Sequence, residues 1–133
     1  MSFEFPVRVY YEDTDAGGVV YHSNYLNFFE RARTEFLRDL GFEQDTLLAQ
    51  GIAFVVRRCE IDYLMAAKFN DALTVTVGIK QLKNTSIEFE QKIVSSSGNL
   101  HSVATVIVVC VDMKKMKPTR IPANIIEELK SDS

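Results

Sequence analysis

The sequence predicts an α+β domain in which an antiparallel five-stranded sheet wraps around one long central helix. Three observations support this fold class: a helical periodicity over residues 24–40, a short strand-like segment before it, and four strand-like segments after it. At 133 residues the chain has the length of one domain, which we expect to span residues 1–133. Because one helix covers only part of such a sheet, we expect another subunit to cover the remaining apolar surface.

The central helix is predicted by apolar residues that recur in steps of three and four. Ser23 or Asn24 is suited to cap its N-terminus, and Gly41 is suited to end it. Phe28 and Leu37 widen the apolar face, whose main positions are Tyr25, Phe29, Ala32, Phe36 and Leu40.

The strands are predicted by runs of apolar and β-branched residues, most of which alternate with polar ones. Residues 5–11 form the first strand, with Val7, Val9 and Tyr11 on one face, and the polar residues 12–18 form a loop. The segment 100–111 is almost continuously apolar, which favours a central strand or one buried at an interface. The other strands are expected over residues 52–63, 73–82 and 85–95, and short helices over residues 46–50 and 123–130.

Composition and charge exclude several classes of function. A net charge of −3 argues against a nucleic-acid-binding surface. The isolated Cys59 and Cys110 lie in apolar runs and are interpreted as buried side chains of a reducing compartment. With two histidines and no metal-binding spacing, no metal site or cofactor is expected. No secretory signal or spanning apolar segment is recognisable, so we expect a cytoplasmic protein.

The residues most suggestive of chemistry lie between Tyr11 and Tyr25, just before the predicted helix. Asp13, Asp15 and His22 stand there beside two glycines. A helix N-terminus offers unpaired N–H groups and partial positive charge, and glycines let the backbone approach a ligand. Such an arrangement can polarise a carbonyl while a carboxylate attacks or activates water.

This segment has two other interpretations. A calcium loop needs a bidentate Glu where this chain has Asn24, so that interpretation fails. Aspartates in a turn most often accept local backbone hydrogen bonds, and from the residues alone this structural role stays open for both Asp13 and Asp15.

The segment 13–25 (DTDAGGVVYHSNY), continued by FFERARTE over residues 28–35, resembles the signature of the 4-hydroxybenzoyl-CoA thioesterase-like family. Within that family it is most similar to the bacterial Tol–Pal-associated acyl-CoA thioesterases. The similarity extends along the chain, through residues 53–57, 108–112 and 115–118. The resemblance implies a hotdog fold, active sites at a dimer interface, and a homotetramer built as a dimer of dimers.

The resemblance also implies roles for individual residues. Asp15 takes the position of the catalytic aspartate, as nucleophile or general base, while Asp13 shapes the loop. The backbone N–H that polarises the thioester carbonyl falls near His22, whose side chain is expected to orient the carbonyl or water. Tyr21 and Tyr25 are expected to line the acyl pocket.

Basic and polar residues elsewhere are candidates for holding CoA. Lys83, Thr85 and Ser86 form a turn where relatives present basic residues to the nucleotide. Arg57 is expected to reach a phosphate or a neighbouring subunit, because phosphates need positively charged donors. The basic residues 114–117 are interpreted as a solvated patch, with an acyl carrier protein or a membrane surface left open as a partner. Glu30 and Arg33 are interpreted as an ordinary surface or interface ion pair.

The sequence therefore predicts a thioester hydrolase acting on short- to medium-chain acyl-CoA, with aliphatic or aromatic acyl groups. A dehydratase of the same fold is disfavoured, because the residues ahead of the helix do not resemble that pattern. The alternative kept beside the enzyme is a non-catalytic module that binds acyl carrier protein or a cell-envelope partner. The acyl preference, the choice between CoA and carrier protein as donor, and the tetramer packing are left open.

Overall fold

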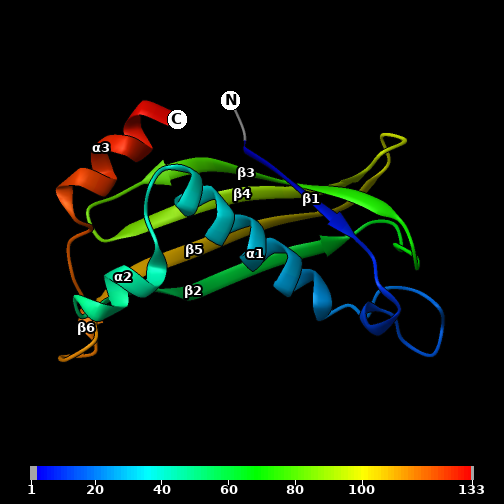
Figure 1. The fold of residues 1–133 in the computed structure, drawn as a ribbon, viewed down its shortest axis with the longest axis horizontal. Coiled ribbons are helices and arrows are strands. Elements are labelled where there is room, and N and C mark those ends of the chain that lie inside the picture. The colour runs from blue at the N-terminus through cyan, green and yellow to red at the C-terminus, as the bar shows by residue number, and fades with distance from the viewer. Residues whose placement is uncertain (1–2, 133) are drawn as a thin grey trace.

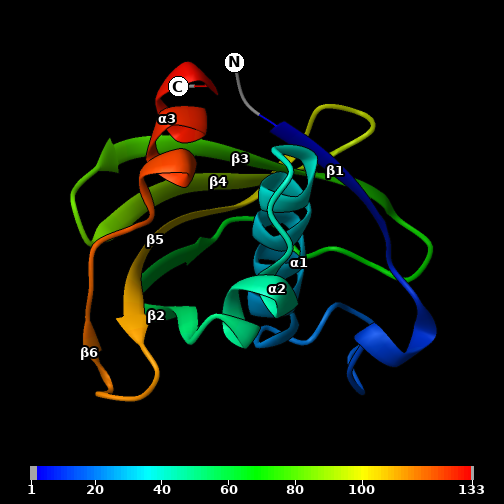
Figure 2. The same ribbon diagram turned by 60° about the vertical axis from the view of Figure 1, so that its left-hand side comes forward.

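An antiparallel sheet curls around one long helix, α1 (Asn24–Asp39), in the computed structural model, which describes residues 3–132 (Figure 1). Seen from the side, the sheet forms a curved wall around this helix (Figure 2). The other elements are β1 (Phe3–Arg8), a 3₁₀ turn (Tyr11–Asp13), α2 (Gln44–Ala49), β2 (Ile52–Tyr63), β3 (Ala72–Leu82), β4 (Ser86–Ser95), β5 (Leu100–Asp112), β6 (Lys117–Pro118) and α3 (Ala123–Asp132).

The strand order is β1-β3-β4-β5-β2, and each neighbouring pair is antiparallel. The two-residue β6 adds to β5, so the sheet has a short sixth strand beyond the five expected. The predicted central strand is confirmed, because β5 lies between β4 and β2. The twelve-residue β2 forms one edge of the sheet, and most of its residues are exposed.

Aromatic side chains join α1 to the sheet. Phe28, Phe29 and Phe36 are buried, and the ring of Phe36 meets that of Phe89 on β4 edge-on at 6.2 Å between centroids. Burying one such side chain stabilises the fold by about 1.5–3 kcal/mol. The apolar stripe of the sequence is thus the face that α1 packs against the sheet.

The helix ends as predicted at Gly41, which has a φ of 97°. Its N–H donates to the carbonyl of Arg38 at 2.9 Å, and the Phe42 N–H donates to the carbonyl of Leu37 at 2.9 Å. These bonds satisfy carbonyls at the end of the helix and require a left-handed residue, which glycine adopts without steric cost.

Two expectations were wrong. The first strand ends at Arg8, and Tyr11 lies in the 3₁₀ turn, 78% exposed, because Asp13 accepts a hydrogen bond from the Tyr10 N–H at 2.8 Å and turns the backbone. Cys59 is exposed rather than buried, because it lies on the edge strand β2, whereas Cys110 on β5 is buried as expected.

The chain places its two candidate regions at opposite ends of the sheet. The loop that leads into α1 lies at one end, and the β3–β4 turn lies beside α3 at the other (Figure 1). Within residues 3–132, none of the helices has both the length and the apolar character needed to cross a membrane.

Candidate active site

The loop before α1 is held in shape by Asp13. Its Oδ1 atom accepts a hydrogen bond from the Asn24 side chain at 2.7 Å, and its Oδ2 atom accepts one from the Tyr10 N–H at 2.8 Å. Its backbone carbonyl accepts a third bond from the Tyr21 N–H at 3.0 Å. Both carboxylate oxygens are therefore engaged within the loop, which confirms the shaping role expected for Asp13.

Asp15 stands at the exposed tip of the same loop. Its N–H donates to the carbonyl of Val19 at 2.9 Å, and its Oδ1 atom accepts a bond from the Gly17 N–H at 2.8 Å. A Cβ at Gly17 would lie 3.2 Å from that Oδ1 atom, so glycine permits this close turn. Among residues 3–132 no donor reaches Oδ2, so Asp15 presents one unoccupied carboxylate oxygen.

Two backbone amides at the start of α1 are also unoccupied. The N–H groups of Asn24, Tyr25 and Leu26 donate to carbonyls three residues earlier. By contrast, the N–H groups of His22 and Ser23 have no acceptor within the described part of the chain. Adjacent free N–H groups at a helix N-terminus can receive a negatively charged oxygen.

His22 and Tyr25 share a shallow hollow of about 240 Å³ with Tyr63 at the end of β2. The His22 ring is exposed and lies 4.7 Å from the Tyr21 ring and 6.2 Å from the Tyr63 ring, centroid to centroid. Asp15 and Tyr21 are not among the residues that line this hollow. The structure thus groups His22, Tyr21 and Tyr25, and leaves Asp15 on the adjoining loop.

The hollow is completed by Leu64, Met65 and Ala66, which the sequence analysis did not single out, and the next residue, Ala67, joins this segment to the loop and to α1. The carbonyl of Ala67 accepts the Val20 N–H at 2.8 Å, and its N–H donates to the Tyr25 hydroxyl at 3.2 Å. The pKa of Tyr25 is raised, chiefly by burial. The neutral phenol therefore persists at neutral pH as the acceptor for this segment, which docks against the loop that carries Asp15.

The residues expected to hold CoA do not lie near this hollow within one chain. Lys83 lines a cavity of about 590 Å³ beside α3, together with Arg120 and Lys130. Thr85 is half-buried and Ser86 is buried; neither lines that cavity. Arg57 is exposed at a β-bulge in the edge strand β2.

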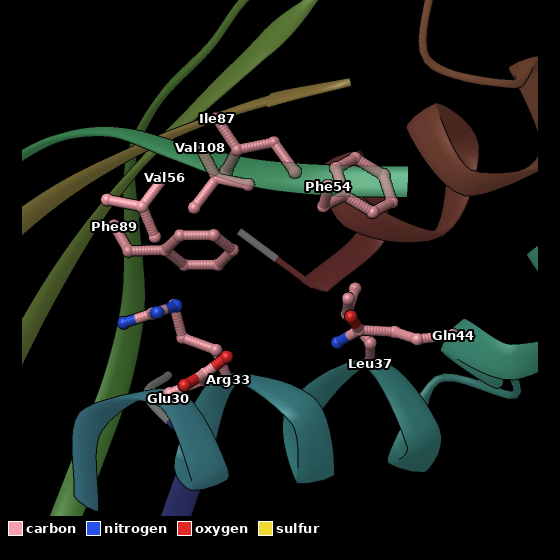
Figure 3. Close-up of a pocket in the computed structure, with 9 residues that line it drawn as sticks. All are labelled: Glu30, Arg33, Leu37, Gln44, Phe54, Val56, Ile87, Phe89 and Val108. Carbon is pink, nitrogen blue, oxygen red and sulfur yellow. The ribbon is translucent and has the colours of Figure 1, made fainter. Parts of the chain in front are cut away.

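The interpretation of Glu30 and Arg33 as an ion pair was wrong. Arg33 is buried, and its Nη1 atom donates to the Gln91 side chain at 3.0 Å, because it points from α1 into the space under the sheet. Figure 3 shows Arg33 extending toward Phe89, with Glu30 beside it on α1. No carboxylate in residues 3–132 lies within ion-pair distance of its guanidinium. Burial lowers the Arg33 pKa, which the charge of Glu30 partly offsets.

Comparison with known proteins agrees with this geometry. A family model described as the thioesterase-like superfamily matches residues 9–129. The chain is 56% identical over 125 residues to the acyl-CoA thioesterase YbgC of Haemophilus influenzae, covering 93% of this chain and 91% of that one. It is 50% identical over 128 residues to the acyl-CoA thioester hydrolase YbgC of Escherichia coli O6:H1, covering 96% of each.

Solved structures give the same result. The crystal structure of a probable thioesterase from Bartonella henselae superposes with a TM-score of 0.85 at 40% identity, covering 92% of this chain and 100% of that one. The curled antiparallel sheet and enclosed helix define a protein of the hotdog-fold class, with a carboxylate and free amides ahead of the helix. The chain belongs to the thioesterase-like superfamily, and the expectation of a thioester hydrolase is confirmed.

Proposed function

We propose that this protein hydrolyses short- to medium-chain acyl-CoA thioesters, with Asp15 as the catalytic carboxylate. The observation that carries the proposal is the free Oδ2 atom of Asp15, on a loop that Asp13 joins by hydrogen bonds to the helix start, where the His22 and Ser23 amides are free. The relatives named as acyl-CoA thioesterases support CoA as the carrier of the acyl group.

The chemistry follows from these two parts. The thioester carbonyl oxygen accepts hydrogen bonds from the two amides, which stabilise the negative charge that develops on it. As general base, Asp15 takes a proton from water while the hydroxyl adds to the carbonyl carbon; as nucleophile, its oxygen adds directly and water later cleaves the anhydride. In both routes the carbon–sulfur bond breaks, the thiolate of CoA leaves and takes up a proton, and the free acid is released.

The edge strand β2 supports assembly into dimers. It is long, carries no proline, and exposes Val55 and Val56 along the edge of the sheet. Exposed edges of this kind pair readily with another strand. A two-fold axis near Arg57 would extend the sheet by antiparallel pairing of two β2 strands. We propose this dimer as the unit of the expected homotetramer.

Such a dimer also explains the distance between the two candidate regions. Antiparallel pairing reverses the second copy, so the Lys83 end of one chain approaches the Asp15 end of the other. Lys83 and Arg120, at the cavity beside α3, then supply positive charge for the phosphates of CoA. Arg57 lies at the interface itself, where it reaches the second copy or the nucleotide.

The experiment that tests the function measures release of free thiol from a panel of acyl-CoAs that differ in chain length and aromaticity. We expect turnover of short and medium chains. The non-catalytic alternative would be favoured if the protein assembles correctly and binds acyl carrier protein but releases no thiol from any acyl-CoA or acylated carrier. The same panel, repeated with acylated carrier protein, decides between the two donors.

A further inference from the structure

The cavity between α1 and the sheet contains a buried cation that has no carboxylate of residues 3–132 within ion-pair distance. Arg33 is 9% exposed, and its guanidinium donates a hydrogen bond to the neutral Gln91 side chain. An arginine has five N–H donors, and buried charges are normally paired. The Gln91 amide is itself committed, because its Nε2 atom donates to the carbonyl of Phe29 at 3.0 Å. A structural role as a tie between α1 and β4 uses only the Nη1 atom of Arg33.

The remaining donors face a small chamber with apolar walls. The chamber offers about 40 Å³ and is lined by Arg33, Glu30 and Gln44 among apolar residues: Leu37, Phe54, Val56, Ile87, Phe89 and Val108 (Figure 3). Because about 10–15 Å³ suffices for one water, this space admits a group of a few heavy atoms. Its walls suit methylene groups, and its cation suits a negatively charged or strongly accepting end group.

The proposed dimer relates the chamber of one copy to the active site of the other. Two of its lining residues, Phe54 and Val56, come from the first half of β2, whereas Tyr63 at the other end of β2 borders the His22 hollow. Antiparallel pairing of two β2 strands sets the end of one against the beginning of the other. In this pairing, the half of β2 that ends at the His22 hollow of one copy would face the half of β2 that lines the Arg33 chamber of the second.

We propose that Arg33 is a specificity-determining residue that receives the terminal carboxylate of a short dicarboxylic acyl-CoA held at the second copy's Asp15. This inference rests on the proposed function and names its substrate class. Glu30, which lines the same chamber, opposes an anionic end group and sets the strength of the selection. The substrate is thus a thioester with an apolar spacer of a few carbons and an acidic end.

The test compares kcat/KM for glutaryl-CoA and valeryl-CoA, which have the same chain length and differ in the terminal carboxylate. In the wild-type protein we expect glutaryl-CoA to be favoured about tenfold or more, as for loss of a charge-assisted hydrogen bond. Arg33→Met should abolish this preference by lowering kcat/KM for glutaryl-CoA more than for valeryl-CoA, and Arg33→Lys should keep much of it. Glu30→Gln, an exposed position that tolerates change, should increase the preference severalfold.

The outcomes separate the two proposals. The role of Arg33 is overturned if the wild type hydrolyses valeryl-CoA and shows no preference for glutaryl-CoA. It is also overturned if the preference is unchanged in Arg33→Met and Glu30→Gln. Either result leaves the proposed function intact. Hydrolysis of neither substrate would overturn both. If Arg33→Met fails to fold, Glu30→Gln decides the matter, because its effect has the opposite sign and needs no change in the core.

Discussion

The Oδ1 atom of Asp13 accepts a hydrogen bond of 2.7 Å from the side chain of Asn24, the first residue of α1. This bond fixes the helix start relative to the loop that carries Asp15. The free N–H groups of His22 and Ser23 at the helix start and the free Oδ2 atom of Asp15 on the loop are therefore held in one hydrogen-bonded segment.

Loss of this clamp should affect both stability and turnover. Asp13→Ala removes two hydrogen bonds to a charged acceptor, so we expect the free energy of unfolding to fall by about 1–3 kcal/mol. Asp13→Asn keeps one carbonyl acceptor and should cost less. Urea denaturation measures the change in stability, and kcat/KM for an acyl-CoA measures the change in turnover. Equal stability of wild type and Asp13→Ala would show that the clamp contributes nothing.

Asp15→Asn tests the catalytic carboxylate. The amide oxygen of asparagine can still accept the Gly17 N–H, so the loop should keep its shape. We expect kcat to fall by roughly 10²–10⁴-fold, because the side chain can no longer take a proton or attack. Thiol release gives the rate, and circular dichroism and sedimentation check the fold and assembly. Glu12→Gln, a neighbouring exposed carboxylate, is the matched control and should retain activity; a similar loss there would contradict a special role for Asp15.

The proposed dimer predicts a defect from a charge on β2. Val55→Asp places a carboxylate on the exposed edge strand, where pairing with a second copy would bury it, and we expect a shift toward monomer. Activity should fall with assembly if the second chain completes the site. Met116→Asp changes an exposed apolar residue in the β5–β6 turn and serves as control. Sedimentation velocity distinguishes the species, and an unaltered oligomer in Val55→Asp would exclude pairing through this strand.

The buried phenol of Tyr25 predicts a loss of stability at high pH. Burial raises its pKa above the ordinary value of 10.0, so the folded protein holds the phenolic proton more tightly than the unfolded chain does. This contribution is fully present below pH 10.0 and is lost as pH rises through the folded-state pKa. In Tyr25→Phe, the free energy of unfolding should decline less steeply above pH 10.0 than in the wild type. The neighbouring Tyr63, whose ring lies 5.3 Å from that of Tyr25, adds to the raised pKa of Tyr25, and its own pKa is raised chiefly by partial burial.

Two glycines give a matched test of backbone strain. Gly41 has a φ of 97° at the end of α1, so Gly41→Ala should lower the free energy of unfolding by about 1 kcal/mol or more. Gly78 has ordinary strand geometry, and a Cβ there would lie 3.7 Å from the carbonyl of Glu90, an ordinary contact. Gly78→Ala should therefore be neutral or slightly stabilising. Thermal unfolding of both variants provides the comparison, and the reverse order would contradict the geometry.

The sequence by itself determined the elements and the loop chemistry. The stripe from Tyr25 to Leu40 predicted α1, alternation predicted β3 and β4, and longer strand-like runs predicted β2 and β5, because local patterns record which side chains must face a core. The residues around Asp15 likewise carry their signal locally, in one continuous segment before a helix. The departure at Tyr11 also has a local cause, since the Asp13 carboxylate competes with the strand for the Tyr10 amide.

Only the tertiary structure decided which distant residues meet. Arg33 pairs with Gln91, 58 positions away, rather than with Glu30, three positions away, because α1 rotates that side chain under the sheet. The exposure of Cys59 follows from strand order, which a residue pattern does not encode. The turn between β3 and β4 and the loop before α1 lie at opposite ends of the sheet, which separates the candidate residues that they carry (Figure 1). Short-range periodicity determines which helices and strands form, whereas packing between segments far apart in the sequence determines which side chains face each other.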